Sequence, residues 1–164
     1  MDFISTYKAI TSSEIFRNFI EYNKEAELVA GFFIIDLVKG NNQRSLDYKL
    51  QQKIFTFSLD ESDEITMRED ELIQSDHPLE KISPDIKIDL DEIPGMAEKE
   101  ALTNNIKNKF QKIIAVLQLH EGKQVWNLTC MLDGFVILNM IVDSETGETI
   151  KFDRKSMADF IKKK

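Results

Sequence analysis

Two apolar runs joined by Asp133-Gly134 constrain the fold more than any other part of the sequence. In "QVWNLTCML" (124–132), large apolar side chains occupy every second position, as expected for a strand with one buried face. The next run, "FVILNMIV" (135–142), is apolar on both faces, which is typical of a strand inside a sheet. Because Asp and Gly both tolerate the positive φ of a type I′ turn, the two runs are predicted to form a β-hairpin.

The segment before this hairpin has a helical spacing. Five apolar residues recur at intervals of three or four: Leu102, Ile106, Phe110, Ile113 and Leu117. This stripe predicts an amphipathic helix after Pro94-Gly95. The end of the stripe, "IIAVLQL", also fits a strand that turns back through Glu121-Gly122, and both interpretations stay open.

The first part of the chain predicts a helix followed by strands. Residues 12–28 have a helical apolar stripe, with Ser12 or Ser13 as its N-cap. "AGFFIIDLV" (30–38) is typical of a buried strand. "LDYKLQQKIFTFSL" (46–59) alternates with one change of phase near Gln52, which indicates one long strand with a bulge or bend. "DESDE" then forms a turn before the short strand "ITM".

Residues 70–95 contain all three prolines of the chain and many acidic residues, so they are predicted to form a connector. Within it, "IKIDL" (86–90) fits an edge strand.

These patterns predict an α+β protein of antiparallel β meanders, each with a packed amphipathic helix. We expect one compact domain over residues 1–164, with two pseudo-repeats of α-β-β-β type. The first covers 12–69, and the second covers 96–164 and includes a C-terminal helix. "FSLDESDEITM" aligns with "MIVDSETGETIKF", so that Asp60 meets Asp143. A chance likeness of two α+β halves explains the pattern equally well.

Composition limits the classes of function. The 164 residues carry a net charge of −8, and the basic residues cluster only at 162–164, so direct nucleic-acid binding is not expected. No apolar stretch is long enough to span a membrane, and the N-terminus does not resemble a secretory signal. One cysteine cannot form an intramolecular disulfide. We therefore expect a cytoplasmic protein.

The sequence contains no convincing catalytic constellation. His77 lies in the connector, His120 at a predicted helix end, and Cys130 on the apolar face of a predicted strand, where a thiol is inert. Neither GxGxxG nor GxxxxGK is present, so no phosphate loop is expected. The sequence predicts no cofactor and no resident metal.

The acidic stretch Asp143-Ser144-Glu145-Thr146-Gly147-Glu148 has two interpretations. Carboxylates at alternate positions can bind a hard cation such as calcium. Asp and Ser followed by Gly also form β-turns, because their side chains accept hydrogen bonds from nearby amides. The positions of an EF-hand loop are not matched, and the turn is favoured.

The C-terminal half resembles a PepSY-type or, more broadly, cystatin-like element. "VWNLTCML" followed by "DGFVILNMIVDSETGETI" is similar to the strand, turn, strand and TG-containing ending of that family. The resemblance covers about residues 98–152. It implies a non-catalytic module, often inhibitory or ligand-sensing.

The tail "RKSMADFIKKK" resembles a sliding-clamp-binding peptide. Met157, Phe160 and Ile161 have the spacing of its apolar anchors, with Arg154 at the position where such motifs usually begin with Gln. Alternatively, these residues form a short final helix that packs on the protein's own core.

The sequence therefore predicts a non-catalytic, intracellular protein-binding or regulatory module, which could also self-associate as a homodimer. One alternative is a small enzyme or ligand-binding protein with a pocket between helix and sheet. Another is an accessory protein that binds a sliding clamp through its tail.

Overall fold

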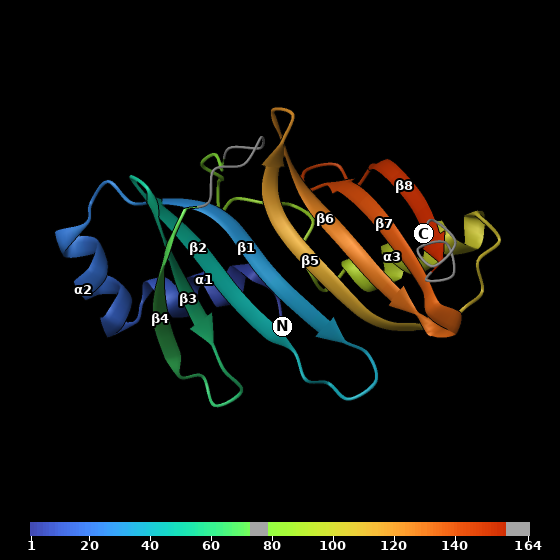
Figure 1. Cartoon of the computed structure of the whole chain (residues 1–164), viewed down its shortest axis with the longest axis horizontal. Helices are drawn as coiled ribbons and strands as arrows, with labels where there is room; N and C mark the ends of the chain where they lie inside the picture. Colours follow the sequence, from blue (N-terminus) through green and yellow to red (C-terminus); the bar gives the residue numbers. More distant parts are fainter. Residues whose placement is uncertain (73–78, 157–164) are drawn as a thin grey trace.

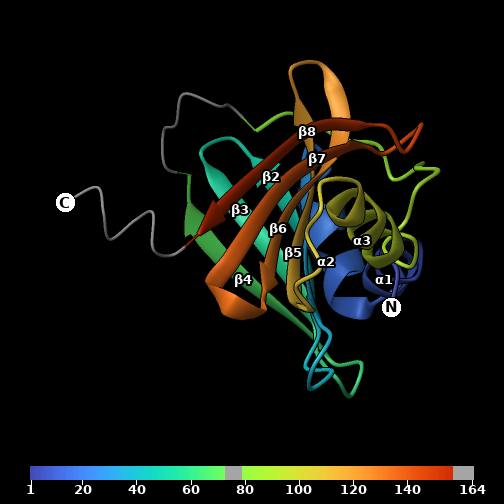
Figure 2. The same cartoon turned by 90° about the vertical axis from the view of Figure 1, so that its right-hand side faces the viewer.

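The computed structural model describes residues 1–72 and 79–156. Its centre is an eight-stranded, fully antiparallel sheet with the strand order β4-β3-β2-β1-β5-β6-β7-β8. The three helices lie on one face of this sheet (Figures 1 and 2). The elements are α1 (Phe3–Thr11), α2 (Glu14–Tyr22), β1 (Glu27–Asp36), β2 (Gln43–Leu50), β3 (Lys53–Leu59), β4 (Ile65–Glu71), α3 (Ile93–Thr103), β5 (Phe110–His120), β6 (Lys123–Leu132), a 3-10 turn (Asp133–Phe135), β7 (Val136–Asp143) and β8 (Thr149–Ser156). The predicted α+β class is confirmed.

In each half of the chain, one or two helices are followed by an antiparallel β meander. The first half contributes α1, α2 and β1–β4, and the second contributes α3 and β5–β8. The first strands of the two meanders, β1 and β5, pair with each other and join the halves into one sheet. Each meander has four strands rather than the predicted three. The division into pseudo-repeats stays a prediction, although the arrangement repeats in both halves.

The turns after the third strand of each half are built alike. The Asp60 carboxylate accepts hydrogen bonds from the amides of Ser62 and Glu64 at 2.9 and 2.8 Å. The Asp143 carboxylate likewise accepts from the amides of Glu145 and Thr146 at 2.8 and 3.3 Å. Two residues aligned in the sequence thus occupy matching places in the two meanders, which is consistent with an internal repeat.

The helices cover one face of the sheet with a continuous aromatic core. Phe3 of α1 contacts both Phe33 of β1 and Trp126 of β6, with ring centroids 6.1 and 6.4 Å apart. Phe16 of α2 packs on Tyr48 and Phe57 of the first meander. Because Trp126 belongs to the second half, α1 packs across both halves.

Residues 82–92 run across the helix-covered side without forming a strand. The Asp89 carboxylate accepts hydrogen bonds from the amides of Phe3 and Ile4, at 2.7 and 3.2 Å, and thereby holds the start of α1. The Trp126 indole donates to the carbonyl of Ile88 at 2.8 Å. The predicted edge strand at 86–90 is therefore wrong. Its amides at Lys87 and Ile88 donate to the single carbonyl of Ser144 rather than to a strand ladder.

The predicted long strand over 46–59 is also wrong. The segment forms two strands, β2 and β3, which pair with each other through a tight turn at Gln51-Gln52. Gln51 has a φ of 56°, a conformation that a residue other than Gly or Asn adopts at some cost. The phase change in the sequence therefore marked a turn rather than a bulge.

The predicted helix over the stripe from Leu102 to Leu117 is correct only at its start. α3 ends at Thr103, and the following residues form the long strand β5. The alternative, a strand turning back through Glu121-Gly122, is confirmed, because β5 pairs with β6 down to His120 and Lys123. His120 accordingly ends a strand and not a helix.

The predicted helix over 12–28 is confirmed for α2, which begins after Ser13 and ends at Tyr22. The Ser13 hydroxyl accepts from the Phe16 amide at 3.2 Å, as expected for an N-cap. Leu28 belongs to β1 instead. The helix α1 was not predicted, although Asp2 caps it by accepting from the Ser5 amide at 2.6 Å.

The hairpin predicted around Asp133-Gly134 is confirmed as the β6–β7 pair. Its connection is one residue longer than a type I′ turn, since Leu132 pairs with Val136 and three residues lie between them. The Asp133 carboxylate accepts from the Lys109 amide at 2.9 Å, which fixes the loop before β5 beside the hairpin. Ser156, which directly precedes the residues predicted as a possible final helix, is the last residue of β8.

Candidate functional site

Within residues 1–72 and 79–156, no helix lies on the second face of the sheet, which faces the viewer in Figure 1. Its residues follow from the strand register, because directly paired residues point to the same side. Phe33 and Trp126 face the helices, so their neighbours in each strand face the other way. One row across all eight strands of this uncovered face is Thr66, Ser58, Ser45, Phe32, Val116, Asn127, Ile141 and Lys151.

The two parts of the uncovered face differ in chemistry. Over β2–β4 it is mainly polar, with serine, threonine and charged side chains, as expected for a sheet face in contact with water. From β1 to β7 it is mainly apolar. We name the following seven residues the apolar strip: Phe32, Ile34, Ile114, Val116, Met131, Ile137 and Ile141.

Most of the apolar strip remains accessible. Phe32 and Met131 are each 36% exposed. Ile34, Ile114 and Val116 are half-buried, as is Ile137. Ile141 is the best covered of the seven, at 8% exposure. These side chains support each other within the sheet, yet their outer surfaces meet no other described element.

Polar groups interrupt and border the strip. Asn127, Thr129 and Asn139 are half-buried on β6 and β7, and the Thr129 hydroxyl lies 3.5 Å from the Asn139 amide oxygen. Three lysines stand along the border: Lys112 on β5, and Lys151 and Lys155 on β8. They share this border with two acidic residues: Asp36, which pairs with Lys112, and Asp153, which pairs with Asn139.

A half-buried carboxyl group lies on the polar part of the uncovered face. Asp47 pairs with Ala30 of β1 and Thr56 of β3, and the Thr56 hydroxyl donates to it at 2.6 Å. Burial raises the pKa of Asp47 above its usual value, while Thr56 and Arg68 act in the opposite direction. A perturbed carboxyl on an open surface can mark function. The charged neighbours of Asp47 are Arg68 and Asp70 of β4, which form an ion pair with each other at 2.8 Å.

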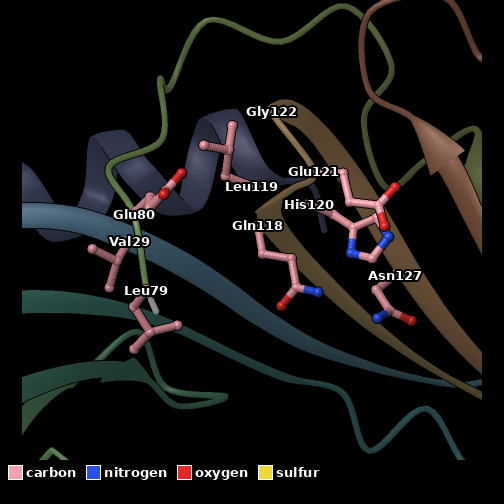
Figure 3. A pocket seen from close by; sticks show the side chains of 9 residues that line it. All are labelled: Val29, Leu79, Glu80, Gln118, Leu119, His120, Glu121, Gly122 and Asn127. Carbon is pink, nitrogen blue, oxygen red and sulfur yellow. The ribbon is translucent and has the colours of Figure 1, made fainter. Parts of the chain in front are cut away.

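A cavity of about 460 Å³ opens where residues 79 and 80 cross the end of the uncovered face (Figure 3). Val29, Leu79 and Glu80 lie on one side of it. The facing side carries the amide and imidazole groups of Gln118, Asn127 and His120, with Glu121 beside them. A cavity of this size can hold a small molecule. Its mixture of carboxylates, amides and imidazole gives it no clear charge preference.

The described residues contain no group of three or more His, Cys, Asp or Glu side chains that could hold a metal ion. Cys130 faces the helix-covered core and is fully buried, and this burial raises the pKa of its thiol to about 12. A thiol with such a pKa is almost wholly protonated near neutral pH, so Cys130 is a poor nucleophile. His77 lies outside the described residues.

The acidic stretch at Asp143 is a turn in the structure. The Asp143 carboxylate is engaged by two backbone amides, and Gly147 has the positive φ of 78° that the turn requires. Ser144 is fully buried and donates its hydroxyl to the Gln124 carbonyl at 2.9 Å. These side chains thus fasten the turn to β6.

The tail residues predicted to bind a partner are only partly described. Arg154 is exposed on β8, where it pairs with Leu138 of β7. Met157, Phe160 and Ile161 lie outside the described residues. Binding of a sliding clamp by this segment stays a prediction.

Sequence reasoning missed the uncovered face. The signal was present in "GFFIID" and "FVILNMIV", where both faces of a strand are apolar. The sequence predicts a buried strand for the first run and a strand inside a sheet for the second. In the structure, the described helices cover one side of these strands and leave the other side uncovered.

Among the residues that the structure describes, no helix is long and apolar enough to cross a membrane. No model of a known protein family matches the chain, and no curated protein matches it. The resemblance to a PepSY-type or cystatin-like element therefore gains no support as a family assignment.

One solved structure is similar to this chain: a protein described as a "putative lipoprotein" from Clostridium difficile 630. The TM-score is 0.62 and the sequence identity 14%, over 87% of this chain and 91% of that chain. At this identity the similarity shows a shared fold and nothing about function or location. The cytoplasmic location of this chain stays a prediction.

Proposed function

We propose that this chain is a non-catalytic protein-binding module and that the apolar strip is its contact surface. The observation that supports the proposal is the contrast between the two parts of the uncovered face. A sheet face that only meets water is normally polar, as it is over β2–β4. The strip instead presents large apolar side chains on four adjacent strands, and contiguous apolar surface of this kind is typical of interaction sites.

The chemistry of the strip also fits protein binding. Phe32 and Met131 are residue types that are enriched in the cores of protein interfaces. The amides of Asn127 and Asn139 and the hydroxyl of Thr129 can form hydrogen bonds with a partner. A surface with apolar anchors and a few polar groups is what an interface core requires.

Polar substitution of the strip tests the proposal. In the double variant Phe32→Ser/Met131→Ser, capture of partner proteins by the immobilised chain should fall at least about tenfold, because truncated apolar anchors commonly cost 1 kcal/mol or more each. The variant should keep its fold, since both side chains are the most exposed of the strip.

A matched control is Ser58→Ala/Thr66→Ala on the polar part of the same face. It should capture the same partners as the unaltered chain. Equal capture by the strip variant and the control would contradict the proposal.

A second candidate function is binding of a small ligand. A cavity of about 380 Å³ is lined by Leu102 of α3, by Ile106 in the loop after it, by Leu37 just after β1 and by Phe110 at the start of β5. It is the kind of site expected for a ligand between helix and sheet. A thermal-shift screen with metabolites and divalent ions distinguishes the two functions, because a ligand of the folded state raises the melting temperature.

A further inference from the structure

We propose that the partner of the apolar strip is an acidic amphipathic protein segment. This inference rests on the proposed function and specifies the chemistry of the partner. The segment places apolar side chains on the strip and carboxylates beside Lys112, Lys151 and Lys155.

The charge along the strip is opposite to that of the chain. The whole protein has 29 acidic and 21 basic residues. Along the strip, three lysines face two acidic residues: Asp36, which pairs with Lys112, and Asp153. Lys151 and Lys155 are exposed, and Lys112 is half-buried. In none of the described ion pairs does any of these lysines take part. Because Asp36 pairs with Lys112, the charges of Lys151 and Lys155 are the ones most available to carboxylates of a partner.

The geometry places these charges along the apolar surface. Lys151 pairs with Ile141, and Lys155 pairs with Ile137, so each lysine lies directly beside a strip residue. Lys112 pairs with Met131 in the same row as Ile137 and Lys155. A segment lying in this row would pass from one lysine to another across two apolar side chains.

Three other occupants fit less well. A second copy of this chain would bring its own lysines toward these lysines. The chain's own tail, residues 157–164, would add three further lysines to the same positive border. An anionic membrane surface would be repelled by the net charge of −8. It would also leave Asn127, Thr129 and Asn139 without hydrogen-bond partners in an apolar layer.

The test uses a fluorescent peptide of alternating leucine and glutamate, and the same peptide with lysine in place of glutamate. The full chain should bind the glutamate peptide, and should bind the lysine peptide at least about tenfold more weakly, because like charges oppose association. Binding should weaken as salt is raised. The variant Lys151→Glu/Lys155→Glu should lose about tenfold in affinity for the glutamate peptide.

The matched control is Lys99→Glu/Lys107→Glu, which changes the net charge equally at exposed positions outside the strip. It should bind nearly as well as the unaltered chain.

If both double variants lose affinity equally, net charge rather than the strip decides binding, and the inference is overturned. If Val116→Asp abolishes binding but Lys151→Glu/Lys155→Glu does not, the proposed function holds and the acidic partner is wrong. If neither changes binding, both are wrong.

Three further measurements address the other occupants. Sedimentation equilibrium should show a monomer, and a dimer that Ile137→Asp dissociates would identify a second copy. Deleting residues 157–164 should not strengthen peptide binding, and a severalfold gain would identify the chain's own tail. Vesicles of phosphatidylglycerol and phosphatidylcholine should not bind, and strip-dependent binding to them would identify a membrane surface. Each of these contrary results overturns the inference.

Discussion

At the residue scale, the carboxyl group of Asp47 shows how position changes the chemistry of a common side chain. Burial raises its pKa, with Asp70 adding to this effect and the Thr56 hydrogen bond opposing it. The folded chain therefore binds this proton more tightly than the unfolded chain does. This tighter proton binding stabilises the folded chain. The stabilisation is fully present below the ordinary pKa of aspartate and is lost as the pH rises through the raised pKa of Asp47.

Asp47→Asn should therefore raise the free energy of unfolding at pH 7, because an amide has no charge to desolvate. The amide oxygen can still accept the Thr56 hydrogen bond. The gain should shrink as the pH falls. It should vanish below about 3.8, where Asp47 of the unaltered chain is protonated in both the folded and the unfolded state. Urea unfolding at several pH values measures this difference.

Asp85→Asn is the control, since Asp85 is exposed. It should change stability little at any pH. A loss of stability in Asp47→Asn at pH 7 would show that the charged carboxylate, through Arg68, stabilises the fold.

At the element scale, the approach of α1 to the sheet depends on Gly31 in β1. A Cβ atom at this position would lie 2.9 Å from the Phe33 ring and 3.4 Å from the Phe3 ring. Gly31→Ala should therefore destabilise the protein by about 1–3 kcal/mol, as overpacking of a core does. Thermal or urea unfolding measures the change.

Gly95→Ala offers a matched comparison in α3, where an added Cβ meets nothing within 4 Å. It should be neutral or stabilise by up to about 1 kcal/mol, because alanine favours helix. Equal effects of the two substitutions would show that α1 can move away from β1 without loss.

The same scale shows which elements the sequence could predict. The Asp133-Gly134 hairpin and the Ser13 cap depend on neighbouring residues, so local patterns were sufficient. The turn at Gln51-Gln52 lacks the usual Gly, Asn or Pro, so the sequence pattern predicts a bulge or bend there instead of a turn. The stripe from Leu102 to Leu117 has helical spacing although it crosses from α3 through a loop into β5. Burial of these residues comes from the whole fold rather than from one helix face.

The candidate site was beyond sequence reasoning for a related reason. Whether Phe32 or Phe33 meets the helices is decided by contacts between distant segments, such as Phe33 with Trp126. The sequence "GFFIID" is apolar at both positions and cannot distinguish them. Asp89, which holds the start of α1, likewise acts across 86 positions of the sequence.

At the scale of the whole molecule, the two halves share one core and one sheet. Trp126 is the single tryptophan of the chain, and it contacts Phe3 and Phe33 from the first half. We therefore expect one cooperative unfolding transition, in which tryptophan fluorescence and far-ultraviolet circular dichroism have the same midpoint. Separate midpoints for the two signals would show that the halves unfold independently.

The pairing of β1 with β5 also has a consequence for synthesis of the chain. About forty residues separate the end of β4, which completes the first meander, from the start of β5, and ribosomes add roughly 5–20 residues per second. The first meander can thus form several seconds before its partner strand exists. During that interval the edge of β1, with its run of phenylalanine and isoleucine, lacks a neighbour. The nascent chain is most exposed to wrong pairing at the strand that later becomes the centre of the sheet.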